Sequence, residues 1–231
     1  MAGCLPEYLP VVIAAVEASR SMDRLIAEVI EWKRANPADD LLTALIDAEE
    51  DGDRMSAREL RDQVSLLFIA GHETTVNLIG TGIYELLRHP DQLARLAGDP
   101  TLVPTAVEEL LRYVSPVQIT RRIATSDLQI RGRQIPKGSF VLCSLASANR
   151  DPDFWGDDAE ELDLGRANAS QHVSFGSGVH YCLGASLAKL EAEAAIGSFV
   201  RRFSRARVVG EPEWNGRINL RGLEKLELDL S

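Results

Sequence analysis

The sequence predicts a mainly α-helical protein with a minor β-sheet, and three observations support this prediction. Apolar residues recur at three- and four-residue spacing through most of the first half of the chain. Short runs rich in β-branched residues, separated by glycine and proline, follow Ser115-Pro116, and helical spacing returns after Gly184. With 231 residues, of which 45% are hydrophobic, the chain can bury a substantial core, which excludes a disordered protein.

The first two helices are predicted over residues 11–32 and 41–48, because apolar residues follow a helical period in both segments. Asn36-Pro37 separates them, since the residue before a proline disfavours helix.

A long central helix is predicted over about 56–89. It begins with a capping box, in which Ser56 is the N-cap and Glu59 follows three residues later, and no strong breaker occurs before His89-Pro90. Its stretch 64–70 is apolar on every face, which is typical of a helix that crosses the centre of a domain.

The remaining elements are shorter, apart from one late helix. Helices are predicted over about 90–98 and 103–113, and a last long helix over about 184–203. Residues 149–177 lack periodicity, so we expect a long ordered loop of the kind that usually has a function. Short strands are predicted over 123–130, 134–135, 140–142, 205–209, 218–220 and 226–230.

Charge and cysteine content narrow the function. Lys and Arg number 25 against 35 Asp and Glu, and a net charge of −10 argues against nucleic acid as a partner. Cys4, Cys143 and Cys182 contain no C-x-x-C pair, so neither a disulfide framework nor a zinc site is indicated. No signal peptide and no membrane-spanning run is recognised, so we expect a cytoplasmic protein without membrane association.

A glycine-rich loop over residues 175–184 carries the strongest chemical signal. Cys182 precedes a predicted helix, whose free N–H groups stabilise a thiolate. Gly178 and Gly184 let the backbone approach a flat ligand closely, and Phe175 is suited to shield the sulfur from water. This combination favours a metal-bound sulfur.

The loop resembles the cysteine-ligand loop of the cytochrome P-450 family, F-x-x-G-x-[RH]-x-C-x-G, and matches it at every specified position. The resemblance implies the cytochrome P-450 fold and haem b (iron protoporphyrin IX) as cofactor. It implies that Cys182 is the metal ligand, as the axial thiolate of the iron, that Phe175, Gly178 and Gly184 surround the cofactor, and that His180 contacts a haem propionate.

A second motif lies in the long helix, at residues 70–75. Glycine and threonine are unfavourable in mid-helix, so we expect a local widening there. The segment resembles the oxygen-activation motif of the family, A-G-x-[DE]-T. The resemblance implies that Ala70 and Gly71 lie beside the haem, and that Glu73 and Thr74 are catalytic residues that deliver protons.

A third motif is the pair Glu109 and Arg112, whose three-residue spacing places acid and base on one helical face. It resembles the E-x-x-R pair of the family, which implies a structural salt-bridge network with Arg166 as its third member. Arg122 aligns with the position that binds a haem propionate, and Arg121 next to it is a rival for that role.

The resemblance implies a monooxygenase that inserts one oxygen atom of O2 into a small apolar organic substrate. Electrons come indirectly from NAD(P)H through a ferredoxin- or flavodoxin-type donor. We expect the substrate pocket to include Phe68, Ile69, Val117, Gln118, Ile119 and Ile218.

The motifs indicate the C-terminal half of a cytochrome P-450 domain over residues 1–231, because a complete soluble member has roughly twice this length. Part of the stretch 64–70 is then expected to be exposed. Two alternatives stay open: a non-catalytic haem-binding remnant, and a haem-thiolate peroxygenase or isomerase, which Thr74 disfavours.

Overall fold

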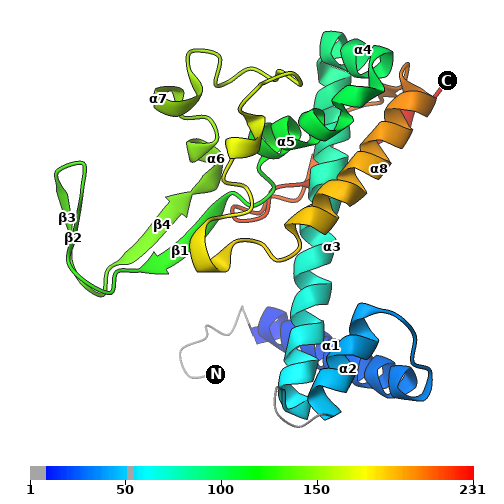
Figure 1. Ribbon diagram of the computed structural model, residues 1–231, viewed down its shortest axis with the longest axis vertical. Helices are drawn as coiled ribbons and strands as arrows, with labels where there is room; N and C mark the ends of the chain where they lie inside the picture. Colours follow the sequence, from blue (N-terminus) through cyan, green and yellow to red (C-terminus); the bar gives the residue numbers. More distant parts are fainter. Residues whose placement is uncertain (1–8, 51–54) are drawn as a thin grey trace. The chain divides into compact units, whose positions relative to one another are not determined.

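The computed structural model describes residues 9–50 and 55–231, so Cys4 lies outside the described residues. The chain divides into two compact units, Met1–Ala70 and Gly71–Ser231, and each is described by itself. The division falls inside one long helix, α3 (Ala57–Arg88), which is drawn in cyan in Figure 1.

The first unit contains α1 (Leu9–Ala35), α2 (Leu41–Glu50) and the first part of α3. The capping box at the start of α3 forms as predicted: the Glu59 backbone N–H donates to Ser56 Oγ over 3.3 Å, and Ser56 N–H donates to Glu59 Oε2 over 2.8 Å. A small core of Ile26, Ile30, Ile46 and Leu60 holds the three helices together.

The second unit is built on the rest of α3 and on three further helices longer than one turn, α4 (Pro90–Gly98), α5 (Val103–Val114) and α8 (Ala185–Phe203). Figure 1 shows α8, in orange, running beside the upper part of α3, with α5 next to both. Very short helices lie between them: η2 (Pro100–Leu102), α6 (Leu145–Ala148), α7 (Pro152–Trp155), η3 (Ala169–Gln171) and η4 (Gly178–His180).

The main core lies where these helices meet. Because apolar residues of α5 recur at helical spacing, one face of α5 is fully buried against α3 and α8. Its buried members are Leu78, Leu86, Leu93, Leu96, Ala106, Val107, Leu110, Leu111, Leu162, Leu164, Ala192, Ile196 and Val200.

The strands of the described residues form four separate two-stranded antiparallel ladders. The fold class, mainly α with minor β structure, is confirmed, but the β structure is not one sheet. The ladders are β1 (Ile119–Ile123) with β4 (Phe140–Ser144), β2 (Leu128–Ile130) with β3 (Arg133–Ile135), β5 (Arg207–Val208) with β8 (Leu228–Asp229), and β6 (Glu213–Trp214) with β7 (Leu223–Lys225).

Two strand predictions are wrong. The predicted strand 123–130 is divided: β1 ends at Ile123 and β2 begins at Leu128, and between them the Asp127 carboxylate accepts the Lys137 N–H over 2.7 Å. The predicted strand 218–220 is part of a connection, and only Leu220 pairs, in a single bridge to Val117. The other predicted elements occur within a few residues of their expected positions.

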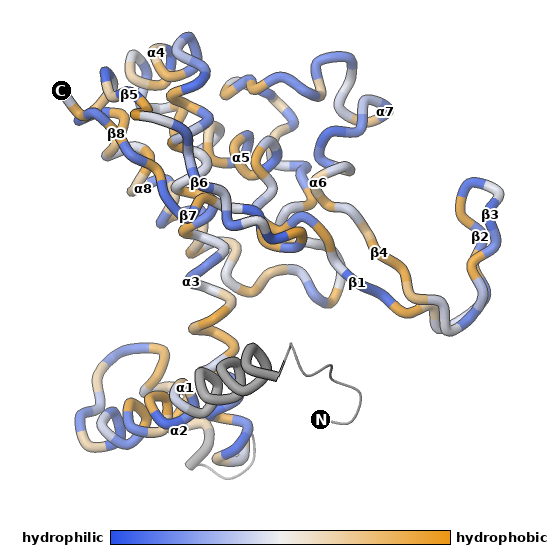
Figure 2. Tube along the Cα trace, turned by 180° about the vertical axis from the view of Figure 1, so that it is seen from behind, coloured by the Kyte–Doolittle hydropathy of each residue, from blue (hydrophilic) through white to orange (hydrophobic). Residues whose placement is uncertain are grey.

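Part of α3 is exposed, as expected for the stretch 64–70. Leu66, Phe68 and Ile69 expose 58%, 55% and 58% of their surface. The β1–β4 ladder also carries exposed apolar side chains, and Figure 2 shows β4 hydrophobic along its length beside a hydrophilic stretch of β1. In residues 9–50 and 55–231, no helix combines the length and hydropathy that a membrane crossing requires.

Candidate haem-thiolate site

The Cys182 loop is a tight turn that ends just before α8. The Cys182 N–H donates to the Phe175 carbonyl over 3.0 Å and closes the loop, and the Cys182 carbonyl accepts the Ala185 N–H at the first residue of α8. Gly176 and Gly178 both adopt a φ of +73°, a conformation that favours glycine. The sequence therefore places a free thiol at a helix N-terminus, and Cys182 is exposed.

The surface beside this thiol is unusually apolar for an exposed loop. Val179 and Leu183 expose 97% and 92% of their surface, on either side of Cys182 in sequence, and Leu187 on the first turn of α8 is also exposed. A Cβ added at Gly178 would meet no atom within 4 Å among the described residues. Sulfur is a soft metal ligand, and the open backbone at Gly178 and the exposed apolar side chains suit a planar apolar ligand. The loop therefore fits a large planar apolar ligand with a central metal ion.

His180 is exposed in the same loop, two residues before the thiol. The Phe175 ring packs against the main core, with the His172 ring 5.5 Å away and the Tyr181 ring 6.2 Å away. The loop thus begins at an anchored aromatic residue.

A carboxylate on α5 fixes both sides of the loop. Glu108 Oε2 lies 3.0 Å from His172 Nε2, and Glu108 Oε1 accepts a hydrogen bond from Lys189 Nζ on α8 over 3.0 Å. His172 Nδ1 accepts the Ser174 N–H, so in the neutral ring the proton is on Nε2 and is donated to Glu108.

These contacts shift the pKa values of two groups, Glu108 and Lys189. The hydrogen bond from His172 lowers the pKa of Glu108, and Lys189 lowers it further. The hydrogen bond to Glu108 raises the pKa of Lys189. The carboxylate is therefore held charged between two donors.

The predicted acid-base network exists as a buried cluster. Arg112 Nε and Nη2 donate to the two oxygens of Glu109 over 2.7 Å each, and both side chains are fully buried. Arg166 Nε donates to Glu109 Oε1 over 3.2 Å, and Arg166 Nη1 pairs with Asp158. The structure thus brings Glu109, Arg112 and Arg166 together.

Arg112 uses all five of its N–H groups. Besides its two bonds to Glu109, it donates to the carbonyl oxygens of Asn149, Ala159 and Glu161 over 2.7 to 2.8 Å. Because these carbonyls belong to the long loop before Cys182, the network fastens that loop to α5.

Arg122 and Arg121 point to opposite faces of β1, because side chains alternate along a strand. Arg122 lies opposite Val141, which is half-buried, whereas Arg121 lies opposite the exposed Leu142. Arg122 Nη1 donates to Thr120 Oγ1 on the same face over 2.7 Å. Of the two rivals, Arg122 therefore lies on the more buried face.

The motif at residues 70–75 lies at the division between the units, with Ala70 at the end of the first and Gly71 at the start of the second. The predicted local widening is wrong: α3 continues as an α-helix through this segment, since a threonine hydroxyl can bond within a helix without opening it. Glu73 and Thr74 are half-buried, and Glu73 forms an ion pair with Arg217.

The predicted pocket residues are scattered. Phe68 and Ile69 belong to the first unit, and Ile218 is 82% exposed. The Gln118 side-chain amide donates to the Ser115 carbonyl at the end of α5. Val117 is half-buried and bridges to Leu220, and Ile119 is half-buried at the start of β1.

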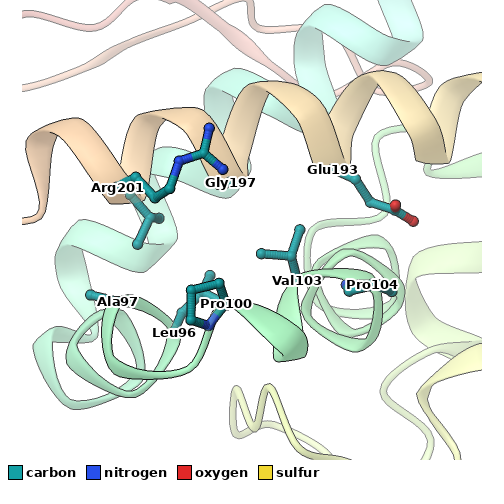
Figure 3. A pocket seen from close by; sticks show the side chains of 9 residues that line it. Leu96, Ala97, Pro100, Val103, Pro104, Glu193, Gly197 and Arg201 are labelled. Atoms are coloured by element: carbon teal, nitrogen blue, oxygen red, sulfur yellow. The ribbon is translucent and has the colours of Figure 1, made fainter.

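A hollow of about 260 Å³ lies elsewhere in the second unit, between α4, α5 and α8 (Figure 3). Leu96, Val103 and Val200 line it, with Glu193 and Arg201 projecting from α8. None of the predicted site residues lines this hollow, so it is distinct from the candidate site.

Sequence reasoning missed several residues that shape the site. Asn149 is fully buried; its amide donates to Ser115 and Ser174, and its Oδ1 accepts the Val173 N–H. The segment Asn149-Arg-Asp-Pro resembles the N-R-D-P segment of the cytochrome P-450 family, but no role for Asn149 followed from this, because its partners are distant in sequence. No local pattern marked Glu108 or Arg217.

Comparison with known proteins agrees with this geometry. The cytochrome P450 family model matches residues 12–215. The chain is 46% identical over 217 residues to cytochrome P450 107B1 of Saccharopolyspora erythraea, covering 92% of this chain and 53% of that protein. It is 47% identical over 210 residues to vitamin D(3) 25-hydroxylase of Pseudonocardia autotrophica, covering 89% and 52%.

A solved structure has the same fold. The tirandamycin C-bound P450 monooxygenase TamI superposes with a TM-score of 0.88 at 44% identity, over 95% of this chain and 56% of that one. The chain spans about half the length of the relatives that it matches. Since the family model matches residues 12–215 and the two curated relatives are 46% and 47% identical, this chain belongs to the cytochrome P450 family.

Proposed function

We propose that the protein of which this chain forms part is a haem-dependent monooxygenase that inserts one oxygen atom of O2 into a small apolar organic substrate. The exposed Cys182 thiol in its glycine loop at the N-terminus of α8 carries this proposal. The hydroxylase and monooxygenase names of the relatives support it.

The chain's residues fit haem b in distinct roles. The Cys182 sulfur is the proposed iron ligand, and the open backbone at Gly178 leaves room for the porphyrin face. Gly184, where a Cβ would lie 4.0 Å from the Cys182 sulfur, is proposed to lie beside the cofactor as well. His180 and Arg122 are the proposed partners of the propionates, since charged donors suit carboxylates. When bound, haem supplies the oxygen chemistry, and the protein supplies orientation and protons.

On the substrate side, Glu73 and Thr74 are the proposed catalytic residues. The Thr74 hydroxyl orients a proton, and the half-buried Glu73 carboxylate replaces that proton after it is transferred. Ala70 and Gly71 leave room beside the cofactor. Phe68, Ile69, Val117, Gln118, Ile119 and Ile218 remain the proposed substrate contacts.

The Glu109–Arg112–Arg166 network is proposed to hold the thiol loop in place rather than to react. Electrons are proposed to come from NAD(P)H through a ferredoxin- or flavodoxin-type protein. A reducing cytoplasm is the proposed setting, because Cys182 must remain a free thiol.

The test is the carbon monoxide difference spectrum of the reduced chain after haem is added. We expect the long-wavelength absorption of a thiolate-ligated haem, lost in Cys182→Ala and kept in the matched variant Cys143→Ala, whose thiol lies in β4. An unchanged spectrum in Cys182→Ala contradicts the proposal. Bound haem with no product from any electron donor favours the alternative, a haem-binding module without catalysis.

A further inference from the structure

A row of polar side chains runs along one ridge of α3, inside the second unit. Asn77, Thr81 and Glu85 follow one another at four-residue spacing and expose only 5%, 3% and 9% of their surface. Residues four apart are neighbours on a helix, so the three side chains form one continuous line. This ridge lies in the half of α3 that packs in the main core.

Each of the three carries a buried polar atom without a hydrogen-bond partner in the described part of the chain. These atoms are Asn77 Nδ2, Thr81 Oγ1 and Glu85 Oε2. Buried polar atoms in folded proteins are almost always bonded to protein or to ordered water. Three exceptions at regular spacing on one helix ridge point to a shared set of ligands.

The spacing suits water. Four residues rise about 6 Å along a helix, and two hydrogen bonds of about 2.8 Å through one water molecule span nearly the same distance. One water molecule between each neighbouring pair therefore satisfies both groups.

The row continues to the surface at both ends with the same spacing. Glu73 lies four residues before Asn77, and its side chain is 32% exposed. His89 lies four residues after Glu85, and its side chain is 30% exposed. Its Nδ1 lies 2.8 Å from the Glu85 carbonyl oxygen and 3.9 Å from Glu85 Oε2, and Arg88 Nη1 lies 3.8 Å from the same Oε2. Both ends are titratable and reach solvent, while the middle is buried.

Asn77 is held in the row by a contact with the C-terminal segment. A Cβ at Gly222 would lie 1.9 Å from Asn77 Oδ1, so only glycine at 222 leaves room for this side chain. The segment at Gly222 and α3 thus pack closely around the Asn77 side-chain amide.

We propose that Asn77, Thr81 and Glu85 bind a chain of water molecules that connects Glu73 with solvent at His89 and resupplies protons to Glu73. Each water accepts one proton from the His89 side and releases one toward Glu73, so one proton moves and nothing is oxidised. The proton role rests on the proposed monooxygenase function, whereas the water chain itself does not.

The first experiment needs no haem: urea unfolding of the full chain for Thr81→Val, Glu85→Gln and the double variant. If one water bridges the two groups, each single change lowers the midpoint and the double change lowers it no further than the larger single effect. Thr81→Ser keeps the hydroxyl and stays nearer to the wild type. A higher midpoint for Thr81→Val, or strictly additive effects, overturns the proposal, because removing an isolated unbonded hydroxyl stabilises a protein.

Thr75→Val is the matched control. Thr75 is buried on the same helix but lies off the row, so we expect its effect to add to that of Glu85→Gln. If the variants do not unfold cooperatively, a crystal structure of the wild-type chain decides. Water bonded to all three atoms supports the proposal, and protein atoms bonded to them overturn it.

The second experiment measures product formed per NAD(P)H consumed by the haem-loaded chain with its electron donor. Thr81→Val is expected to lower this yield by about tenfold, with an unchanged substrate-binding spectrum and with recovery in Thr81→Ser. An unchanged yield overturns the proton role and leaves the first result standing. Absence of a thiolate haem spectrum contradicts the proposed function alone.

Discussion

Arg112 is a cation that the protein has removed from water without leaving any of its donors unbonded. Two N–H groups bond Glu109 and three bond carbonyls of the loop, at distances of 2.7 to 2.8 Å. Such a pair adds little over a well-packed apolar alternative, but losing one partner strands a buried charge. Its value here is therefore geometric, since it specifies the path of the loop.

Arg112→Ala is expected to lower the free energy of unfolding by about 3 to 5 kcal/mol, because Glu109 and three carbonyls lose the hydrogen bonds that Arg112 donates. Urea unfolding measures this. The control is Arg131→Ala, whose exposed pair with Asp153 contributes at most about 1 kcal/mol. Equal effects of the two changes would show that the buried network is not stabilising.

Glu108 predicts a specific pH dependence. Because contacts with His172 and Lys189 lower its pKa, its contribution is present above its ordinary value of about 4.3 and is lost as pH falls through the lowered pKa. The raised pKa of Lys189 makes the same contact persist below about pH 10.4 and disappear as pH rises through the raised value.

We therefore expect Glu108→Gln to flatten the curve of unfolding free energy against pH at both its acid and its alkaline end. The matched change Glu191→Gln, at an exposed position of α8, should leave the pH dependence of the unfolding free energy unchanged at both ends. Parallel curves for the wild type and Glu108→Gln argue against this assignment.

At single positions, sequence reasoning succeeded where a short motif brought its own geometry. Glu109 and Arg112 are one helical turn apart, so their contact follows from spacing alone, and Cys182 lies in a turn that its glycines require. It failed where the partner is distant: Asn149 meets Ser174, and Glu73 meets Arg217 across 144 residues. No local pattern encodes such contacts.

Among the elements, α3 combines good and poor helix-forming segments. Gly71 and Gly80 lie inside this helix, and a Cβ added at either would meet nothing within 4 Å among the described residues. Neither glycine is thus required by packing in this structure. Only Gly71 belongs to the motif proposed to lie beside the haem.

Gly71→Ala and Gly80→Ala are each expected to raise the unfolding free energy of the haem-free chain by about 0.5 to 1 kcal/mol, since glycine is a poor helix former. Only Gly71→Ala should weaken haem binding, measured by absorbance titration, because a methyl group there occupies the proposed cofactor side. Equal haem affinity in the two variants would contradict the proposal that Gly71 lies beside the haem.

Helices were easier to predict than strands. Capping at Ser56 and the prolines in the first turns of α4 and α5 set the helix starts locally. Strand ends are marked less clearly: β1 ends at Ile123, opposite Phe140, and the segment Ala124-Thr-Ser-Asp that follows contains no glycine or proline. The left-handed pair Arg131 and Gly132 turns β2 into β3, and Gly132 was the only one of these signals visible in the sequence.

For the molecule as a whole, exposed apolar side chains occur in both units, and one group of them belongs to the thiol loop and the start of α8. Val179, Leu183 and Leu187 are largely exposed around the thiol loop. At about 25 cal/mol per Å², covering even 100 Å² of such surface contributes about 2.5 kcal/mol. A bound porphyrin is therefore expected to stabilise the second unit substantially.

We expect thermal unfolding of the chain to shift upward as haem is added, by an amount equivalent to about 2.7 kcal/mol when free haem reaches 100 times its dissociation constant. Differential scanning calorimetry measures the shift. Cys182→Ala should show little of it, and Cys143→Ala the full effect. A melting temperature independent of haem, with haem demonstrably bound, contradicts this expectation.

The loop that presents Cys182 is fastened to α5, and the contacts that fasten it join residues 37 to 57 positions apart in the chain. Closing rings of that size costs entropy before any bond compensates for it, so such contacts form late in folding. The thiol therefore gains a fixed path only after these long-range contacts have formed. Haem binding should therefore follow folding of the polypeptide, because haem that is added earlier finds no ordered thiol loop to bind.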